Sequence, residues 1–206
     1  MKRFTARLVF SALALAGLTL AAQPVAAGKF NKVLSVGDKA PAWEQLIGVD
    51  GKKHSLSDLK DAKAVVVAFT CNHCPIAQAY EDRFTAFAAD AKKRGVAFVA
   101  INVNTIEPDR LDKMKERAEQ KGFNFPYLYD ETQKIGKAYG AAVTPHLFVL
   151  DGERKIAYMG AFDSDINRRE GDKLYVEDAV EAILAGKQPE VTETRPSGCS
   201  IKYNQE

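Results

Sequence analysis

The chain has 206 residues, of which 46% are hydrophobic and 27% charged, and this length and composition fit one medium-sized domain with its own core. Its 29 basic and 27 acidic residues give a formal net charge of +2. Because this balance is close to neutral, it excludes recognition of nucleic acid or of an anionic membrane surface by overall charge, and we expect neither as a partner.

Residues 1–27 have the pattern of a signal peptide. Three basic residues lie within the first seven positions, an apolar stretch follows over 8–22, and a small-residue cleavage site ends at Ala27. An apolar stretch of about 15 residues is short for a membrane-spanning helix. We therefore expect cleavage before Gly28, no membrane insertion of the mature chain, and a periplasmic or secreted location, where a disulfide can persist.

The first half of the mature chain alternates between strand and helix patterns. Within 36–59, Asp50-Gly51 is a turn signal between short apolar runs and predicts a hairpin. The apolar run 64–69 predicts a buried strand, and apolar residues at spacings of three and four over 76–91 predict a helix. The nearly continuous apolar run 96–103 predicts a second buried strand.

The second half continues this alternation. The expected elements, in order, are a helix over 109–121, a strand over 125–129, a short helix over 133–139, strands over 146–150 and 155–159, a loop over 163–173 and a helix over 176–184. Strands that alternate with helices predict an α/β architecture. No repeat or low-complexity tract divides the sequence, so we expect a single domain over 28–206.

Two cysteines, Cys71 and Cys74, closely follow the strand predicted over 64–69. Pro75 fits the first position of the next helix, because its missing N–H would have no intrahelical partner there. The free N–H groups and the dipole of that helix favour a thiolate, and in such motifs a cysteine pKa falls from about 8.5 to roughly 3.5–7.5. Strand, turn and helix together predict a redox site that forms a disulfide between Cys71 and Cys74.

We expect Cys71 to be the attacking thiol, because the first cysteine of such a motif is the more exposed and the helix covers the second. His73 lies between the two cysteines and, when protonated, adds a charge that stabilises the Cys71 thiolate. One pKa unit corresponds to roughly 30 mV for a two-electron couple. His73 is therefore expected to raise the reduction potential by tens of millivolts.

Zinc binding is the alternative for this motif, but structural zinc sites use four ligands, often as two separated pairs. The chain has three cysteines and three histidines, with no second pair. We therefore expect no metal and no cofactor. A lone histidine at the start of a strand, such as His146, is more often structural than functional.

Four stretches carry a resemblance to a known family: 36–43 (VGDKAPAW), 69–75 (FTCNHCP), 143–151 (VTPHLFVLD) and 198–203 (GCSIKY). In these the chain resembles the redoxin (AhpC/TSA-like) proteins of the thioredoxin fold, close to peroxiredoxin-like proteins that carry a CxxC motif. The resemblance implies a central mixed sheet flanked by helices, an N-terminal hairpin extension and a C-terminal tail containing Cys199. It also implies a thiol–disulfide oxidoreductase that acts on protein thiols and disulfides together with a redox partner protein.

The resemblance implies a role for Thr144 and Pro145 as well. In thioredoxin-like folds a cis-proline faces the CxxC motif and the residue before it offers backbone groups to a bound peptide, so we expect both residues to bind substrate. Thioredoxins also have a tryptophan before the first cysteine and a buried carboxylate in the preceding strand. Here Thr70 takes the place of the tryptophan and 64–69 contains no acid, so His73 or water is expected to handle the proton.

Two other functions remain open. A peroxiredoxin-like thiol peroxidase would use Cys74 as its peroxide-attacking cysteine. However, that family has a threonine, a proline and a catalytic arginine where this chain has Cys71, Val67 and Pro145. A Cu(I)-binding chaperone of the thioredoxin fold would hold its metal through two cysteines and a histidine, although such chaperones usually separate the cysteines by three residues.

Cys199 is the odd cysteine. The residues before it, Pro196–Gly198, predict a mobile loop rather than a packed element. A leftover cysteine in an exported protein is a reactive thiol or an intermolecular partner. The tail has the reach to fold back towards the CxxC motif, so we expect Cys199 to exchange disulfides with Cys71 and Cys74, within one chain or across a dimer.

Overall fold

A computed structural model describes residues 28–167 and 173–205, so the expected signal peptide, 1–27, and part of the expected loop lie outside the described residues. The strands are β1 (Leu46–Gly48), β2 (Lys53–His54), β3 (Ala64–Phe69), β4 (Val96–Asn102), β5 (Tyr127–Tyr129), β6 (Val143–Thr144), β7 (His146–Leu150), β8 (Ile156–Gly160) and β9 (Cys199–Ser200). The helices are α1 (Pro75–Lys93), α2 (Leu111–Lys121), α3 (Lys134–Tyr139) and α4 (Tyr175–Leu184), with 3-10 turns η1 (Leu56–Leu59) and η2 (Glu107–Asp109). In the described ranges, no helix combines the length and apolar character needed to cross a membrane.

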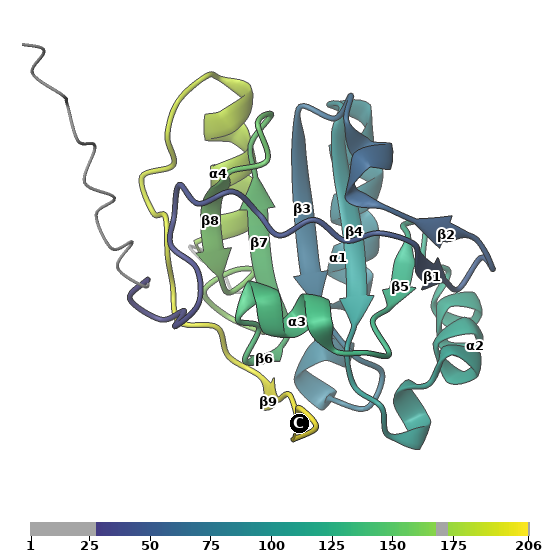
Figure 1. The fold of residues 1–206 in the computed structure, drawn as a ribbon. Coiled ribbons are helices and arrows are strands. Elements are labelled where there is room, and N and C mark those ends of the chain that lie inside the picture. The colour runs from purple at the N-terminus through teal and green to yellow at the C-terminus, as the bar shows by residue number, and fades with distance from the viewer. Residues whose placement is uncertain (1–27, 168–172, 206) are drawn as a thin grey trace, which may run out of the picture.

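Seven strands form the central sheet, in the order β2-β1-β5-β4-β3-β7-β8, while β6 and β9 form a separate pair. β3 lies near the middle because all six of its residues are apolar and fully buried. It runs parallel to β4 and antiparallel to β7, so that Phe69 pairs with Ile101 on one side and with His146 on the other. This mixed sheet, with helices on both faces and the β1–β2 hairpin at one edge, confirms the expected architecture (Figure 1).

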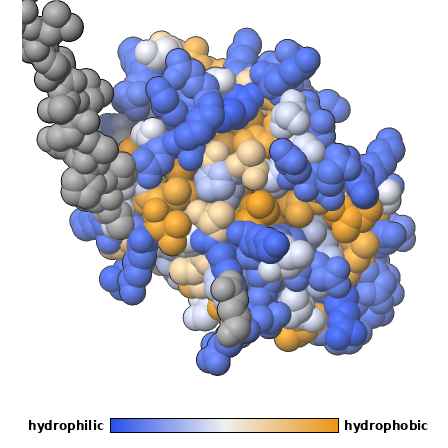
Figure 2. Space-filling view, in the orientation of Figure 1, coloured by the Kyte–Doolittle hydropathy of each residue, from blue (hydrophilic) through white to orange (hydrophobic). Residues whose placement is uncertain are grey.

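Side chains alternate between the two faces of the sheet and fill two apolar clusters. Val66 of β3 belongs to the cluster under α1 and α4, which includes Phe84, whereas Val67 belongs to the opposite cluster, with Trp43 and Ile201. Figure 1 shows α1 and α4 behind the sheet and α3 in front of it. On the outside of the front face, Figure 2 shows hydrophilic residues around smaller hydrophobic areas.

The helix expected over 109–121 begins later, at Leu111. Arg110 has an extended backbone, with φ −70° and ψ 160°, and separates η2 from α2. Asp109 is turned away from α2 because its carboxylate accepts hydrogen bonds from the backbone of Asn72 and His73. The sequence pattern therefore predicts α2 correctly except for its first turn.

Residues 196–198 form no regular secondary structure, as expected for a loop, but Cys199 itself lies in a strand. Cys199–Ser200 form β9, which pairs antiparallel with β6. Ile201 is buried, and the hydroxyl of Tyr203 donates to the carbonyl oxygen of Ala141 at 2.7 Å. Backbone pairing and apolar burial past the cysteine fix this segment, which the proline and glycine before it could not indicate.

Candidate active site

The two cysteines of the CxxC motif lie between the end of β3 and the start of α1. Cys74 is the N-cap residue of α1, with φ −77° and ψ 118°, and Pro75 takes the first helical position as expected. Both thiols are free, and Cys71 is 2% exposed and Cys74 0%. Contrary to expectation, Cys71 is scarcely more exposed than Cys74, and neither sulfur is open to a large partner in this state.

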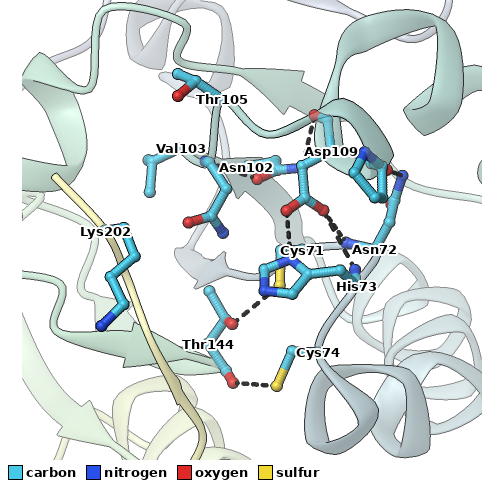
Figure 3. A network of polar contacts seen from close by, with 12 residues as sticks. Cys71, Asn72, His73, Cys74, Asn102, Val103, Thr105, Asp109, Thr144 and Lys202 are labelled. Atoms are coloured by element: carbon cyan, nitrogen blue, oxygen red, sulfur yellow. Dashed lines mark hydrogen bonds and ion pairs between the residues drawn. The ribbon is translucent and has the colours of Figure 1, made fainter. Parts of the chain in front are cut away.

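Thr144 lies opposite the motif and contacts both sulfur atoms (Figure 3). Its hydroxyl oxygen is 3.0 Å from Sγ of Cys71, and its carbonyl oxygen accepts a hydrogen bond from Sγ of Cys74 at 3.3 Å. The peptide bond between Thr144 and Pro145 is cis. The structure thus brings these four residues together, as the sequence resemblance implies, and substrate binding by Thr144 and Pro145 stays a prediction.

Cys74 is held in surroundings that favour its thiolate. Burial opposes ionisation, but the thiol of Cys199 and the backbone N–H groups of Ala77, Cys199 and Ile76 donate to its sulfur. Together these donors lower the pKa of Cys74. Because two of the N–H groups belong to the first turn of α1, the helix start stabilises the second cysteine of the motif rather than the first.

Cys71 is in the opposite situation. Burial raises the pKa of Cys71 to about 12, although the Thr144 hydroxyl can donate to its thiolate, and the charge of Asp109 adds to the increase. The sequence pattern predicts Cys71, near His73, as the attacking thiolate. In the structure the pKa of Cys71 is raised and that of Cys74 is lowered, so Cys74 is the thiol that ionises more readily.

His73 pairs with a carboxylate. Its Nδ1 hydrogen-bonds Oδ2 of Asp109, and Oδ1 of the same carboxylate accepts the backbone N–H groups of Asn72 at 2.7 Å and His73 at 3.2 Å. The side chain of Asp109 is fully buried. A ring nitrogen of His73 also lies within 4.8 Å of the Cys71 sulfur, so the expected effect of His73 on the Cys71 thiolate stays a prediction, with Asp109 as a second partner of the ring.

Asp109 supplies the buried carboxylate that the strand before the motif lacks, and sequence reasoning missed it. Because β3 and β4 are parallel, their carboxyl ends lie at the same edge of the sheet, so residues shortly after β4 can reach the motif after β3. Asp109 follows β4 by seven residues and is placed by η2. An acid after the neighbouring parallel strand was the available signal.

One group of potential metal ligands exists among the described residues. Sγ of Cys71, a ring nitrogen of His73 and a carboxylate oxygen of Asp109 lie within 4.8 Å of one another. The Cu(I) alternative required both cysteines with the histidine, whereas this group lacks Cys74 and adds a carboxylate, a ligand that does not suit Cu(I). The donor set therefore disfavours the copper-chaperone alternative.

The structure brings Cys199 to the same place. Cys199 pairs with Thr144 in the β6–β9 register, packs against the cluster that Cys71 and Cys74 form with Ala77, and hydrogen-bonds Cys74 through its side chain. The shared proton, together with partial burial, raises the pKa of Cys199 to about 11. All three cysteines of the chain form one cluster.

His146, next to Pro145, is buried in the fold. We expect acid to destabilise the folded protein because it protonates this buried ring. Its ring is buried, packs on Phe148 with centroids 4.6 Å apart, and burial lowers its pKa from 6.5 to about 4. The unfolded chain protonates this ring below pH 6.5 and the folded protein only near pH 4, so stability is lost as pH falls through this window. The loss is at most about 1.4 kcal/mol per pH unit. Urea unfolding at a series of pH values measures how the free energy of unfolding depends on pH. The His146→Leu variant should lose the part of this pH dependence that His146 causes. An unchanged pH dependence in the variant would contradict the assignment.

The chain is similar to several known proteins. The family model described as Redoxin matches residues 35–174. The chain is 28% identical to the thiol-disulfide oxidoreductase ResA of Bacillus thuringiensis (strain Al Hakam) over 124 residues. This alignment covers 60% of this chain and 68% of that one. It is 30% identical over 135 residues to Rv2521 of Mycobacterium tuberculosis, whose name assigns it provisionally to the peroxiredoxins. This alignment covers 60% of this chain and 82% of that one. A solved uncharacterised protein from Geobacillus kaustophilus is 36% identical with a TM-score of 0.79, covering 85% of this chain and 96% of that one.

The match of one family model over most of the chain, the mixed sheet and the cysteine pair after its central strand are consistent with one another. A thioredoxin-like redox function follows at this coarse level from the relatives and from the cysteine cluster. The chain belongs to the redoxin family of thioredoxin-fold proteins.

Proposed function

We propose that this redox enzyme exchanges disulfides with protein thiols through Cys71 and Cys74. The observation that carries the proposal is the contact of both sulfur atoms with one residue, Thr144, at 3.0 Å and 3.3 Å. Contact with one residue places the two sulfurs in the same site, as a disulfide between them requires. The similarity to a thiol-disulfide oxidoreductase supports the same reaction.

The pKa order of the two thiols indicates the sequence of steps. The Cys74 thiolate attacks a partner disulfide and forms a mixed disulfide, releasing one partner sulfur as a thiolate. Cys71 then loses its proton and attacks the Cys74 sulfur, which releases the second partner thiol and leaves the Cys71–Cys74 disulfide. Two electrons pass to the partner, and the reverse sequence oxidises a partner dithiol. The direction depends on the reduction potentials of the two couples.

Residues 1–27 are proposed to direct export and to be removed, which leaves one domain over 28–206 in the periplasm or outside the cell. The basic start, the apolar stretch and the small-residue cleavage site support this. An oxidising compartment would let the disulfide persist and would supply protein substrates with cysteines. Thr144 and Pro145 are proposed to hold the partner next to the sulfurs.

Equilibration with glutathione tests the proposed exchange. The reduced protein is incubated at a series of glutathione redox ratios, quenched with an alkylating reagent and mapped by non-reducing peptide mass spectrometry. We expect a reversible two-electron transition in which a Cys71–Cys74 disulfide appears. Failure of this disulfide to form at any ratio would reject the exchange mechanism.

A thiol peroxidase is the second candidate, and one observation favours it. Cys74 is the N-cap residue before Pro75 and has a lowered pKa, which are the conditions for attack on a peroxide. Position 145, where the related peroxidases have a catalytic arginine, is a proline. Consumption of hydrogen peroxide as fast as disulfide exchange would favour this candidate over the first.

A further inference from the structure

The C-terminal tail covers one edge of β6. Val143 pairs with Ser200 and Thr144 with Cys199 in an antiparallel ladder. If the tail were absent, the backbone groups at this edge would be open to an extended peptide, since strand addition to an exposed edge is a general way in which proteins bind peptides. The tail therefore pairs with β6 in the manner of a bound peptide.

The fit is close on both sides of the tail cysteine. A Cβ atom on Gly198 would lie 2.0 Å from the carbonyl oxygen of Thr144, so a side chain there would force the tail away from β6. After the cysteine, Ile201 is 8% exposed, and the Tyr203 hydroxyl donates to the carbonyl oxygen of Ala141. Glycine before the cysteine and two anchoring side chains after it hold the tail in register.

Of the three cysteines, Cys199 is the one with partial exposure. Cys71 and Cys74 are buried, whereas Cys199 is half-buried and lines a cavity of about 380 Å³ together with His73 and Ile106. Ile106 is 47% exposed, so the cavity opens beside an apolar surface residue. A thiol or disulfide reagent entering this cavity meets Cys199 before it meets the CxxC pair.

We propose that the C-terminal strand is an internal substrate: it occupies the edge of β6 where a partner's strand would pair, and it presents Cys199 to Cys74 for disulfide exchange. This inference rests on the proposed exchange function of the Cys71–Cys74 pair. It assigns the partner as an extended protein segment containing a cysteine, which replaces the tail on β6. While the tail is bound, Cys199 is the contact between the buried pair and solvent.

The internal step needs no further oxidant or reductant. The Cys199 thiolate attacks the Cys74 sulfur of the Cys71–Cys74 disulfide. The Cys74–Cys199 S–S bond forms, the Cys71–Cys74 S–S bond breaks, and the electron pair of the broken bond leaves with Cys71. Cys71 takes up one proton and Cys199 has released one, so the oxidation state of the protein is unchanged.

The Cys71→Ser variant tests the exchange. After equilibration with oxidised glutathione, non-reducing peptide mapping is expected to find Cys74 joined to Cys199 within one chain. Mapping that finds Cys74 only as a glutathione mixed disulfide, or joined to Cys199 of a second molecule, would overturn the internal-substrate assignment. The wild-type protein is mapped in parallel, so absence of its Cys71–Cys74 disulfide would instead reject the proposed function.

The Gly198→Ala variant tests whether the C-terminal tail shields Cys74 from solvent. We expect iodoacetamide to alkylate Cys74 in the reduced full-length variant about tenfold faster than in the wild type, because an added methyl group disfavours the packed tail. Gly152→Ala is the matched control: its Cβ would have only an ordinary contact, 3.5 Å from the carbonyl oxygen of Lys63. Equal alkylation rates in the wild type and both variants would reject the proposal that the tail shields Cys74.

A second tail variant keeps this test valid if Gly198→Ala does not fold. Tyr203→Ala removes a tail anchor without changing β6, β9 or any cysteine, and circular dichroism verifies its fold. It is expected to raise the Cys74 alkylation rate in the same direction. A folded Tyr203→Ala protein with wild-type rates, combined with an unfolded Gly198→Ala protein, would count against the proposal.

Discussion

Replacing Cys74 with serine is expected to abolish thiol–disulfide exchange, with a loss of at least about a thousandfold, as when a covalent nucleophile is removed. Cys74 lies in one cluster with the other two cysteines and is the sulfur common to the two proposed disulfides. Serine at this position therefore removes the Cys71–Cys74 and the Cys74–Cys199 bonds together. Reduction of a glutathionylated peptide, followed by its fluorescence or mass, measures the rate.

The Cys71→Ser variant is the informative comparison, because it keeps the thiolate with the lowered pKa and loses only the buried thiol with the raised one. It is expected to attack a partner disulfide and to accumulate Cys74 as a disulfide with Cys199. In a Cys71→Ser/Cys199→Ser double variant, Cys74 should instead be trapped in a mixed disulfide with the partner. Trapping on Cys71 in the Cys74→Ser variant would restore the order of attack expected from sequence.

The fold could be predicted from sequence because its signals are local and strong. The run 64–69 is wholly apolar and forms the central strand, and spacings of three and four set the buried face of α1, where Tyr80, Phe84 and Phe87 pack inward. The first turn expected for α2 was wrong. Its first residue, Asp109, is turned by hydrogen bonds to the distant residues 72 and 73, and no local pattern contains them.

The cysteines and Thr144 of the candidate site were predictable from sequence, whereas Asp109 and the electrostatics of the site were not. Cys71, Cys74 and Thr144 follow from motif spacing and family resemblance, and they come together as expected. Which thiol has the lower pKa depends on which sulfur the helix N–H groups and Cys199 reach, and that is a matter of tertiary geometry. Pairing of a two-residue strand such as Cys199–Ser200 leaves no periodic pattern in sequence, so the strand that follows the loop at 196–198 was not predicted.

Replacing Asp109 with asparagine is expected to slow disulfide exchange by about a hundredfold, within the range for loss of a proton acceptor. The pKa of Cys71 is raised to about 12, so its attack on a mixed disulfide requires transfer of a proton. The Asp109 carboxylate and the His73 ring both lie within 4.8 Å of the Cys71 sulfur, a distance that one water molecule can bridge. The substitution also removes a negative charge, which lowers the Cys71 pKa, but a fall of one unit gains only about tenfold in thiolate and does not offset the loss.

Two further measurements separate a loss of proton transfer from a loss of structure at the site. They are the stability of the Asp109→Asn protein and the exchange rate of a His73→Ala protein. Losing charge-assisted hydrogen bonds to Asn72 and His73 should lower the free energy of unfolding by about 2–3 kcal/mol, whereas Asp112→Asn, at an exposed acid three residues on, should have little effect. His73→Ala keeps the carboxylate and its two backbone donors, so exchange should slow by less than about tenfold. Equal hundredfold losses in both variants would place proton transfer on the His73–Asp109 pair as a unit. Wild-type exchange by a folded Asp109→Asn protein would show that the buried carboxylate only positions the loop between the two cysteines.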